Sequence, residues 1–158
     1  SRVLKLINKL KLIDKINESK ITKHIINICY DQEYALDYKK IEKEFSLTFE
    51  EFINFHSSHD FYVFMIGFMP GLPFLGLLNT KIKIPRLENP RLNVPKGSLG
   101  IVDNLSVIYP NQSPGGWNII GKTNYKLFNH KKNISIIKPG DIVKFKKVNK
   151  KLFYKNDY

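Results

Sequence analysis

The chain has 158 residues, about one domain, and its 42% hydrophobic and 13% aromatic content is too high for a disordered chain. Its formal net charge is +12, yet only three of its 26 basic residues are arginines. Nucleic-acid sites tend to combine arginine with stacked aromatic side chains, so composition argues against nucleic acid as the partner.

The basic residues are concentrated near the end of the chain. Residues 1–60 hold ten basic and ten acidic groups, whereas residues 122–158 hold eleven basic and two acidic groups. A run of like charge is typical of a solvated surface. We therefore expect residues 149–158 to form a basic tail in solvent.

The sequence contains few features that indicate a cellular compartment. No segment approaches the roughly 20 consecutive apolar residues that a membrane-spanning helix needs. The apolar residues 1–17 are interrupted by lysine every few positions, unlike the core of a secretory signal. The single cysteine, Cys29, excludes an internal disulfide framework and fits a reducing compartment. These features predict a cytoplasmic protein with no membrane partner.

The first 60 residues have mostly helical patterns. Apolar residues recur at three- and four-residue steps over residues 3–16, which predicts an amphipathic helix. Residues 24–30 are short, β-branched and apolar, as in a strand, and residues 36–45 suggest a second helix. Thr48 and Glu51 then have the spacing of a capping box, which predicts a third helix start.

From about residue 60 the pattern becomes that of a β protein. All eight prolines and all nine glycines follow this point. They separate short apolar runs that predict strands, at residues 61–68, 105–110, 117–120 and 141–145. We expect a compact all-β barrel or sandwich over residues 61–148, preceded by a separate unit over residues 1–60. The lone strand at residues 24–30 either joins the later sheet or pairs with strands before Ser1.

Residues 116–123 read GWNIIGKT and match the phosphate-loop pattern G-x-x-x-x-G-K-[ST]. A phosphate loop needs a tight, glycine-rich curl followed by a helix. Here the central residues are bulky or β-branched, which favours a strand, and no helical stripe follows. We therefore interpret the match as a Gly-Gly turn that leads into a strand.

Three clusters rich in proline and glycine are predicted to form loops on the barrel, and such loops commonly carry binding groups. They are GFMPGLPFLG (residues 67–76), IPRLENPRLNVPKGS (residues 84–98) and YPNQSPGGW (residues 109–117). Two proline–glycine sets are expected to fix the loop shapes, namely Pro70 with Gly71 and Pro95 with Gly97.

Arg86 and Arg91 are the only arginines beyond the N-terminal tip. A guanidinium can bind a carboxylate or phosphate through two parallel hydrogen bonds, which lysine cannot reproduce. The two residues are therefore candidates for an anion clamp. Alternatively, they bond loop carbonyls and Glu88 and have a structural role.

The third cluster adds neutral groups to this candidate binding site. Gln112 and Ser113 could donate and accept hydrogen bonds, and the amides of Gly115 and Gly116 are further donors. Trp117 could form one wall of a pocket, or it could simply pack in the core.

A catalytic residue is not evident. His56 is a weak candidate, because a lone histidine at a helix end more often makes a structural hydrogen bond. The histidines and Cys29 lack metal-ligand spacing, so we expect no metal. Residues 61–158 contain only four acidic groups and no paired carboxylates. Chemistry at this barrel therefore points to a site shared with another chain.

The three clusters in this order resemble a known family, that of the 5-oxoprolinase B subunit, also called the sporulation kinase A inhibitor or allophanate hydrolase subunit 1. The matching motifs are GFMPGLPFLG, PRLENPRLNVPKGSLGI, IYPNQSPGGWNIIGKT and KPGDIVKF. The resemblance extends over residues 24–145. It implies a mainly β protein, with a cyclophilin-like barrel after part of a small α/β domain whose early strands would lie before Ser1.

The resemblance also implies an activity, the ATP-dependent opening of 5-oxoproline to L-glutamate. The active site would be shared with partner subunits of the A and C kinds, and the lactam substrate would use the groups named above. ATP is the implied cofactor. Alternatives within the family are a regulator that inhibits a sensor histidine kinase and an allophanate or urea-amidolyase type of subunit. At one place the chain departs from the family, where Leu105, Ser106 and Val107 replace a Gln-Thr-Gly turn.

Overall fold

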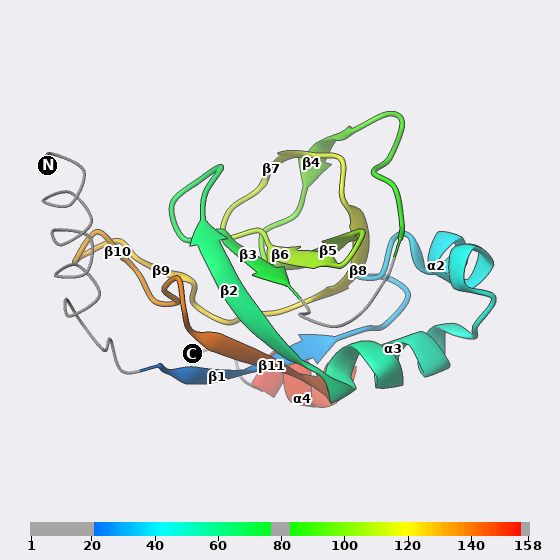
Figure 1. Cartoon of the computed structure of the whole chain (residues 1–158), viewed down its shortest axis with the longest axis horizontal. Helices are drawn as coiled ribbons and strands as arrows, with labels where there is room; N and C mark the ends of the chain where they lie inside the picture. Colours follow the sequence, from blue (N-terminus) through cyan, green and yellow to red (C-terminus); the bar gives the residue numbers. More distant parts are fainter. Residues whose placement is uncertain (1–20, 77–82, 156–158) are drawn as a thin grey trace, which may run out of the picture.

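Seven strands of the computed structural model close into a barrel, in the order β1-β11-β2-β3-β6-β5-β8 (Figure 1). The structure describes residues 21–76 and 83–155, and the helix expected at residues 3–16 lies outside them. The barrel strands are β1 (Lys23–Cys29), β2 (Asp60–Ile66), β3 (Pro73–Gly76), β5 (Ser98–Val102), β6 (Leu105–Ile108), β8 (Asn118–Lys122) and β11 (Ile142–Val148). The prediction of a mainly β protein with a barrel is confirmed.

Two consecutive helices pack beside the barrel, α2 (Tyr38–Phe45) and α3 (Phe49–Ser58). The capping box is confirmed: the Thr48 hydroxyl accepts from the Glu51 amide, and the Glu51 carboxylate accepts from the Thr48 amide. This arrangement satisfies two amides that the first helical turn leaves without partners. The buried face of α3 carries Phe52 and Ile53 into the main core, against the inner side chains of the barrel.

The strand β1 is part of the barrel. It runs parallel to β11 in continuous register from Lys23 opposite Ile142 to Cys29 opposite Val148, and Cys29 also pairs with Lys122 of β8. The alternative that this strand joins the later sheet is therefore confirmed, and it does not depend on strands before Ser1 for a partner. The buried side of β1 needs the barrel interior, which later residues provide. The division of the chain into domains stays a prediction.

The start of β1 is fastened by a buried polar group. The Asp141 carboxylate accepts from the Thr22 and Lys138 amides and lies 2.9 Å from His24 Nε2. Burial alone would raise the pKa of Asp141, but the hydrogen bonds from His24, Lys138 and Thr22 outweigh it and lower the pKa. The other ring nitrogen of His24 is 3.0 Å from the Tyr125 hydroxyl. These bonds hold the starts of β1 and β11 together.

The phosphate-loop pattern forms a strand, as predicted. Asn118 to Lys122 make β8, which pairs with β5 along one edge, and Gly121 lies opposite Leu99. No helix follows, since residues 123–127 have no regular structure. The pattern therefore lacks the geometry by which a phosphate loop binds an anion.

Two small antiparallel ribbons stand outside the barrel. One pairs β4 (Arg91–Val94) with β7 (Ser113–Gly115), and the other pairs β9 (Phe128–Asn129) with β10 (Ile134–Ser135). The β4–β7 ribbon joins the second and third proline–glycine clusters, so these predicted loops contain strand. A second core cluster includes Val94 of the ribbon together with Tyr109 and Trp117.

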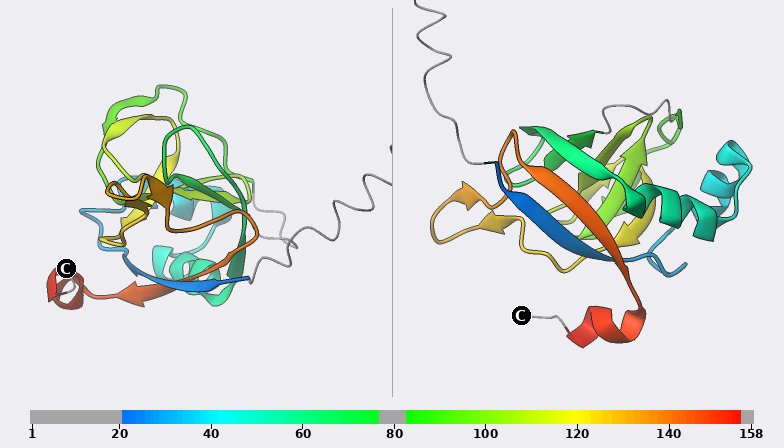
Figure 2. Two further views of the ribbon diagram at one scale, coloured as in Figure 1. Left: turned by 90° about the vertical axis from the view of Figure 1, so that its left-hand side faces the viewer. Right: turned by 60° about the horizontal axis from the view of Figure 1, so that its bottom comes forward.

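The basic end of the chain is not an isolated tail. Residues Lys150–Lys155 form the helix α4, which follows β11 at the C-terminal end (Figure 2). Its Phe153 packs against Cys29 and Val148. Lys147 pairs with Glu50, and Lys150 pairs with Glu33. These pairs are about half exposed, so each contributes little stability, but they place the C-terminal positive charge beside acids from the first 60 residues.

Asp37 links three parts of the fold. Its amide donates to the Ile119 carbonyl, and its carboxylate accepts from the Ile119 amide at 2.6 Å and from Arg91 Nη2 at 2.7 Å. The Asp37 side chain is only 9% exposed. Arg91 Nη1 is buried without a partner in the described part of the chain. The Asp37 carboxylate therefore compensates the positive charge of Arg91, and it ties α2, β8 and the β4–β7 ribbon together.

Replacing Asp37 with alanine is expected to lower the free energy of unfolding by about 2–4 kcal/mol, because it leaves the Arg91 charge and the Ile119 amide unpaired. Urea denaturation measures this loss. Asp60→Ala is the matched control, because it removes an exposed partner of Lys23 and should cost under about 1 kcal/mol. Equal losses in the two variants would contradict the role of Asp37.

Candidate functional site

A cavity of about 300 Å³ lies where the three proline–glycine clusters meet. The first cluster contributes Phe68 and Phe74, the second contributes Arg86, and the third contributes Gly116 and Trp117. The β4–β7 ribbon and the loop before β3 bring these segments together. The lining is mostly apolar, with one cation at the edge, which is typical of a small-molecule site.

Arg86 is the predicted clamp residue that lines this cavity. Its guanidinium carbon is 5.6 Å from the centre of the Trp117 ring, a distance that allows a cation–π interaction. It forms no ion pair with the residues that the structure describes. The fork of Arg86 is thus held over an aromatic wall while its donors remain available to an anionic ligand.

Arg91 has a different environment. Its guanidinium pairs with Asp37, away from the cavity lining, and its side chain is 26% exposed. Arg91 thus has the structural role that the sequence left open as an alternative to an anion clamp, although its partner is Asp37 rather than Glu88. Arg91 lies opposite Gly115 in the ribbon. It positions the third cluster through the backbone, whereas Arg86 faces the cavity directly.

The third cluster supplies backbone to the cavity. A Cβ on Gly115 would lie 2.4 Å from the Tyr109 hydroxyl, so only glycine permits this close approach. The Gly116 carbonyl accepts from the Leu87 amide at 2.8 Å, which ties the second cluster to the third. Trp117 is 7% exposed and packs in the second core cluster. Both interpretations of Trp117 therefore apply, because it is a core residue and a cavity wall.

Two predicted site residues are used within the ribbon. The Gln112 amide donates to Asn93 Oδ1 at 3.1 Å, and the Ser113 hydroxyl donates to the Pro114 carbonyl at 3.2 Å. Neither Gln112 nor Ser113 lines the cavity. Their part in ligand binding stays a prediction.

The loop-shaping residues lie at turns that precede strands. Pro70 and Gly71 form the turn before β3, and Pro95 precedes Gly97 before β5. Gly97 has φ +80°, and a Cβ there would lie 2.1 Å from the Thr123 carbonyl oxygen. A side chain at Gly97 would therefore be excluded both by conformation and by contact.

Sequence patterns did not single out Phe68 or Tyr109 as site residues. Phe68 has φ +66° and is 71% exposed, while Tyr109 is 2% exposed and lies under the cavity. Burial raises the pKa of Tyr109, partly offset by the Arg86 charge, so its hydroxyl stays protonated at neutral pH. The only available signal was their place beside proline and glycine, which does not indicate which way a side chain points.

His56 lies in the core and does not line the cavity. Its Nδ1 is 3.1 Å from the Tyr30 hydroxyl and its Nε2 is 3.1 Å from Ser106 Oγ. Burial lowers the pKa of His56 to about 3. A fully enclosed neutral ring cannot exchange a proton with a ligand in the cavity, so the structure does not support His56 as a catalytic residue.

The departure at residues 105–107 falls on the strand β6. Ser106 faces inward to His56, whereas Val107 lines the cavity. An apolar side chain therefore stands at this part of the wall. Among the described residues, no group of three or more His, Cys, Asp or Glu side chains could hold a metal ion.

Comparisons with known proteins agree with this architecture. The family model "Carboxyltransferase domain, subdomain C and D" matches residues 1–137. The chain is 36% identical over 147 residues to the 5-oxoprolinase B subunit of Bacillus subtilis, and the match covers 91% of this chain and 61% of that protein. The chain thus spans about three-fifths of that relative's length.

Solved structures give the same picture. A conserved uncharacterized protein from Pyrococcus horikoshii superposes with a TM-score of 0.77 at 38% identity, covering 84% of this chain and 62% of that one. The K. lactis urea amidolyase has a TM-score of 0.75 at 17% identity, covering 85% of this chain and 10% of that one. The second likeness shows the fold alone.

The class defined by the barrel and its loops is therefore a carboxyltransferase-like domain. The chain belongs to the family of carboxyltransferase domains, subdomains C and D, and within it resembles the B subunit of 5-oxoprolinase. None of the described helices has the length and apolar character needed to cross a membrane.

The environment of His56 predicts a pH dependence of stability. An unfolded histidine takes up a proton near pH 6.5, whereas the folded pKa is about 3. The unfolded state thus binds more protons, and stability falls as the pH drops below 6.5. We expect wild type to lose about 2–3 kcal/mol of unfolding free energy between pH 6.5 and 4.5 from this residue alone.

The His56→Gln variant should lack this part of the pH dependence, as measured by urea unfolding at each pH. His130→Gln removes an exposed ring and should retain the wild-type slope. If His56→Gln and wild type have parallel stability profiles, the ring is not held neutral in the folded state.

Proposed function

We propose that this chain contributes to an ATP-dependent 5-oxoprolinase, which opens 5-oxoproline to L-glutamate at a site completed by partner subunits. One observation carries the proposal: Arg86, without an ion pair in the described structure, lies over Trp117 at a small apolar cavity. The chain that presents this cavity is 36% identical to a 5-oxoprolinase B subunit.

The chemistry of the substrate matches the lining. 5-Oxoproline carries one carboxylate, which the Arg86 fork can bind through two hydrogen bonds. Its small ring can pack on Trp117 and Phe74. Gly115 and Gly116 also line the cavity, and their backbone can approach the lactam amide closely because neither residue carries a side chain. Each part of the ligand therefore has a complementary group in the cavity.

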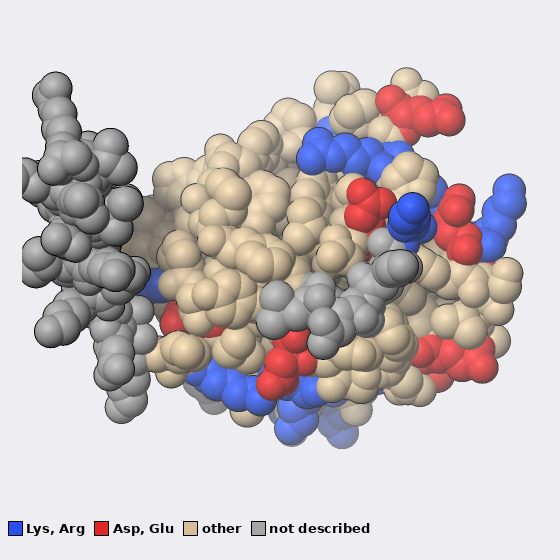
Figure 3. Space-filling model, viewed as in Figure 1, with Lys and Arg blue, Asp and Glu red and all other residues tan. Residues whose placement is uncertain are grey.

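Partner subunits are needed because the described lining contains no carboxylate, histidine or cysteine to activate water. The surface formed by Phe68 of the cavity and by Phe64 and Met65 of β2 also fits a shared site. Phe64, Met65 and Phe68 are 45%, 50% and 71% exposed, and Figure 3 shows a broad uncharged area over this side of β2. An apolar surface beside a cavity is typical of a protein interface. We assign the complementary surfaces to subunits of the A and C kinds.

In the proposed reaction the γ-phosphoryl group of ATP passes to the lactam carbonyl oxygen and ADP leaves. Water then adds to the activated carbon, inorganic phosphate is released, and the lactam C–N bond breaks to give L-glutamate. This chain orients the substrate, with Arg86 fixing the carboxylate and Trp117 the ring. Orientation of this kind lowers the barrier because the reacting groups no longer need to find one another. The proton transfers fall to groups on the partner subunits.

Arg86→Lys is expected to reduce kcat/KM for 5-oxoproline at least tenfold, mainly through KM, since an ammonium cannot form the paired hydrogen bonds. The assay measures glutamate release by the chain reconstituted with its partner subunits and ATP. Arg91→Lys is the matched control. It should lower unfolding stability, because Arg91 bonds Asp37, and leave KM within about threefold.

The assay distinguishes failure of the proposed function from failure of the role assigned to Arg86. If the wild-type complex releases no glutamate from 5-oxoproline, the proposed function is wrong. If the wild-type complex is active and Arg86→Lys has a normal KM, only the assignment of Arg86 to the carboxylate is wrong.

A further inference from the structure

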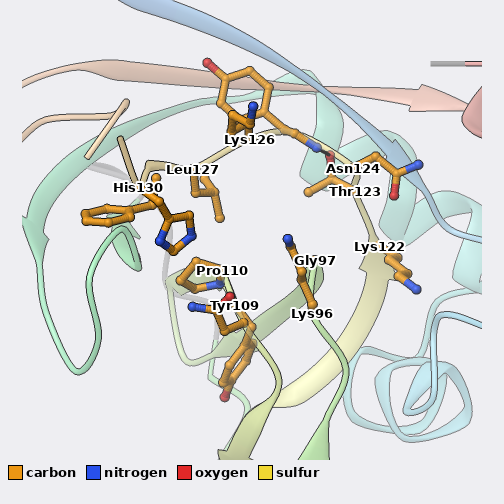
Figure 4. A pocket seen from close by; sticks show the side chains of 13 residues that line it. Lys96, Gly97, Tyr109, Pro110, Lys122, Thr123, Asn124, Lys126, Leu127 and His130 are labelled. Carbon is orange, nitrogen blue, oxygen red and sulfur yellow. Dashed lines mark hydrogen bonds between the residues drawn. The ribbon is translucent and has the colours of Figure 1, made fainter. Parts of the chain in front are cut away.

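A second cavity, of about 360 Å³, lies on another side of Tyr109 (Figure 4). It is formed by the turn before β5, the segment between β6 and β7, and the irregular segment that follows β8. Tyr109 lines both this cavity and the one beside Arg86, so the two cavities share one wall.

The charged residues that line this second cavity are all basic. Lys96, Lys122, Lys126 and His130 all line it, and no described lining residue is acidic. Lys122 is directed elsewhere, since its ammonium is 5.3 Å from the centre of the Tyr34 ring. Figure 4 shows Lys96 directed into the cavity, His130 at its edge and Lys122 turned away.

Lys96 and Lys126 form no ion pair with the described residues, and both side chains are exposed. Elsewhere the structure pairs several lysines with carboxylates, as at Lys23, Lys147 and Lys150. Two ammonium groups that no described carboxylate neutralises raise the positive potential of this concave surface, because surrounding walls of low dielectric focus the field. The cavity therefore favours an anion.

The backbone beneath Lys96 is held in place. The Gly97 amide donates to the Tyr109 carbonyl at 2.7 Å, and the Thr123 amide donates to the Gly97 carbonyl at 2.9 Å. These bonds tie together all three segments that form the cavity. The Lys96 stem thus starts from a fixed point, which lowers the entropy lost when the ammonium binds a ligand.

The remaining walls are apolar. Pro110, Leu127 and Phe128 line the cavity beside the lysines. A site with cations on one part and apolar walls on another fits a ligand with an anionic head and an organic body. Two separate ammonium groups act as point charges, and each can donate to a different oxygen of a phosphate.

We propose that this cavity binds the phosphate of a small organic phosphate, with Lys96 and Lys126 as the donors and the apolar wall holding its organic part. The site does not have phosphate-loop geometry, because Lys122 of the matching pattern faces Tyr34 and no helix follows it. It is also separate from the lactam site, so binding can be tested without any hydrolysis.

Titration calorimetry of the full chain at low ionic strength tests the site, with ATP, inorganic phosphate and adenosine as probes. ATP is expected to bind at least tenfold more tightly than inorganic phosphate, and adenosine is expected not to bind. Lys96→Ala and Lys126→Ala should each weaken ATP binding about tenfold or more, the usual effect of losing a charge-assisted hydrogen bond. Lys146→Ala removes an exposed lysine of β11 and should change affinity less than twofold.

The other outcomes overturn specific parts of the proposal. No binding of ATP or phosphate by a folded chain would remove the site. Equal weakening by all three lysine variants would show diffuse attraction to a basic surface instead. Equal affinity for ATP and inorganic phosphate would refute the role of the apolar wall. Because both ammonium groups are exposed, circular dichroism should show that the variants remain folded.

Discussion

The arrangement of this molecule depends on the hydrogen bonds that the Asp37 carboxylate accepts. It accepts from the Ile119 amide and from Arg91, and thereby joins α2, the barrel strand β8 and the β4–β7 ribbon. Burying a carboxylate is favourable only when its oxygens are bonded and its charge is compensated. The same pair holds the ribbon against the barrel, and the ribbon leads into the glycine backbone that lines the cavity beside Arg86.

The two arginines have different environments. Arg91 is committed to Asp37 and fixes the position of Gly115 across the ribbon, whereas Arg86 lies over Trp117 with its donors available. A barrel poor in acids and histidines thus presents one guanidinium, that of Arg86, to a cavity. Under the proposed function the cavity orients a small acid, and its exposed apolar residue Phe68 suits completion of the site by another chain.

Much of the local structure could be predicted because it depends on neighbours in the sequence. The Thr48–Glu51 capping box starts α3, and the bulky residues inside the phosphate-loop pattern make β8 a strand. The candidate site was predictable only in outline. Proline–glycine clusters indicated which loops carry it, but Gln112 and Ser113 bond within the ribbon, while Phe68 and Tyr109 line the cavity without any distinguishing pattern.

The amino-acid sequence by itself determined the β class, the helix start at Thr48, the loops of the site and the family, since these follow from local patterns and ordered motifs. Only the tertiary structure decided that β1 lies beside β11, that Asp37 engages Arg91 but leaves Arg86 available, and that His56 is sealed in the core. Each of these depends on residues at least 50 positions apart, or on which side of a chain faces inward. These pairings form only when distant segments of the chain come together in the barrel, and local sequence preferences do not specify which segments those are.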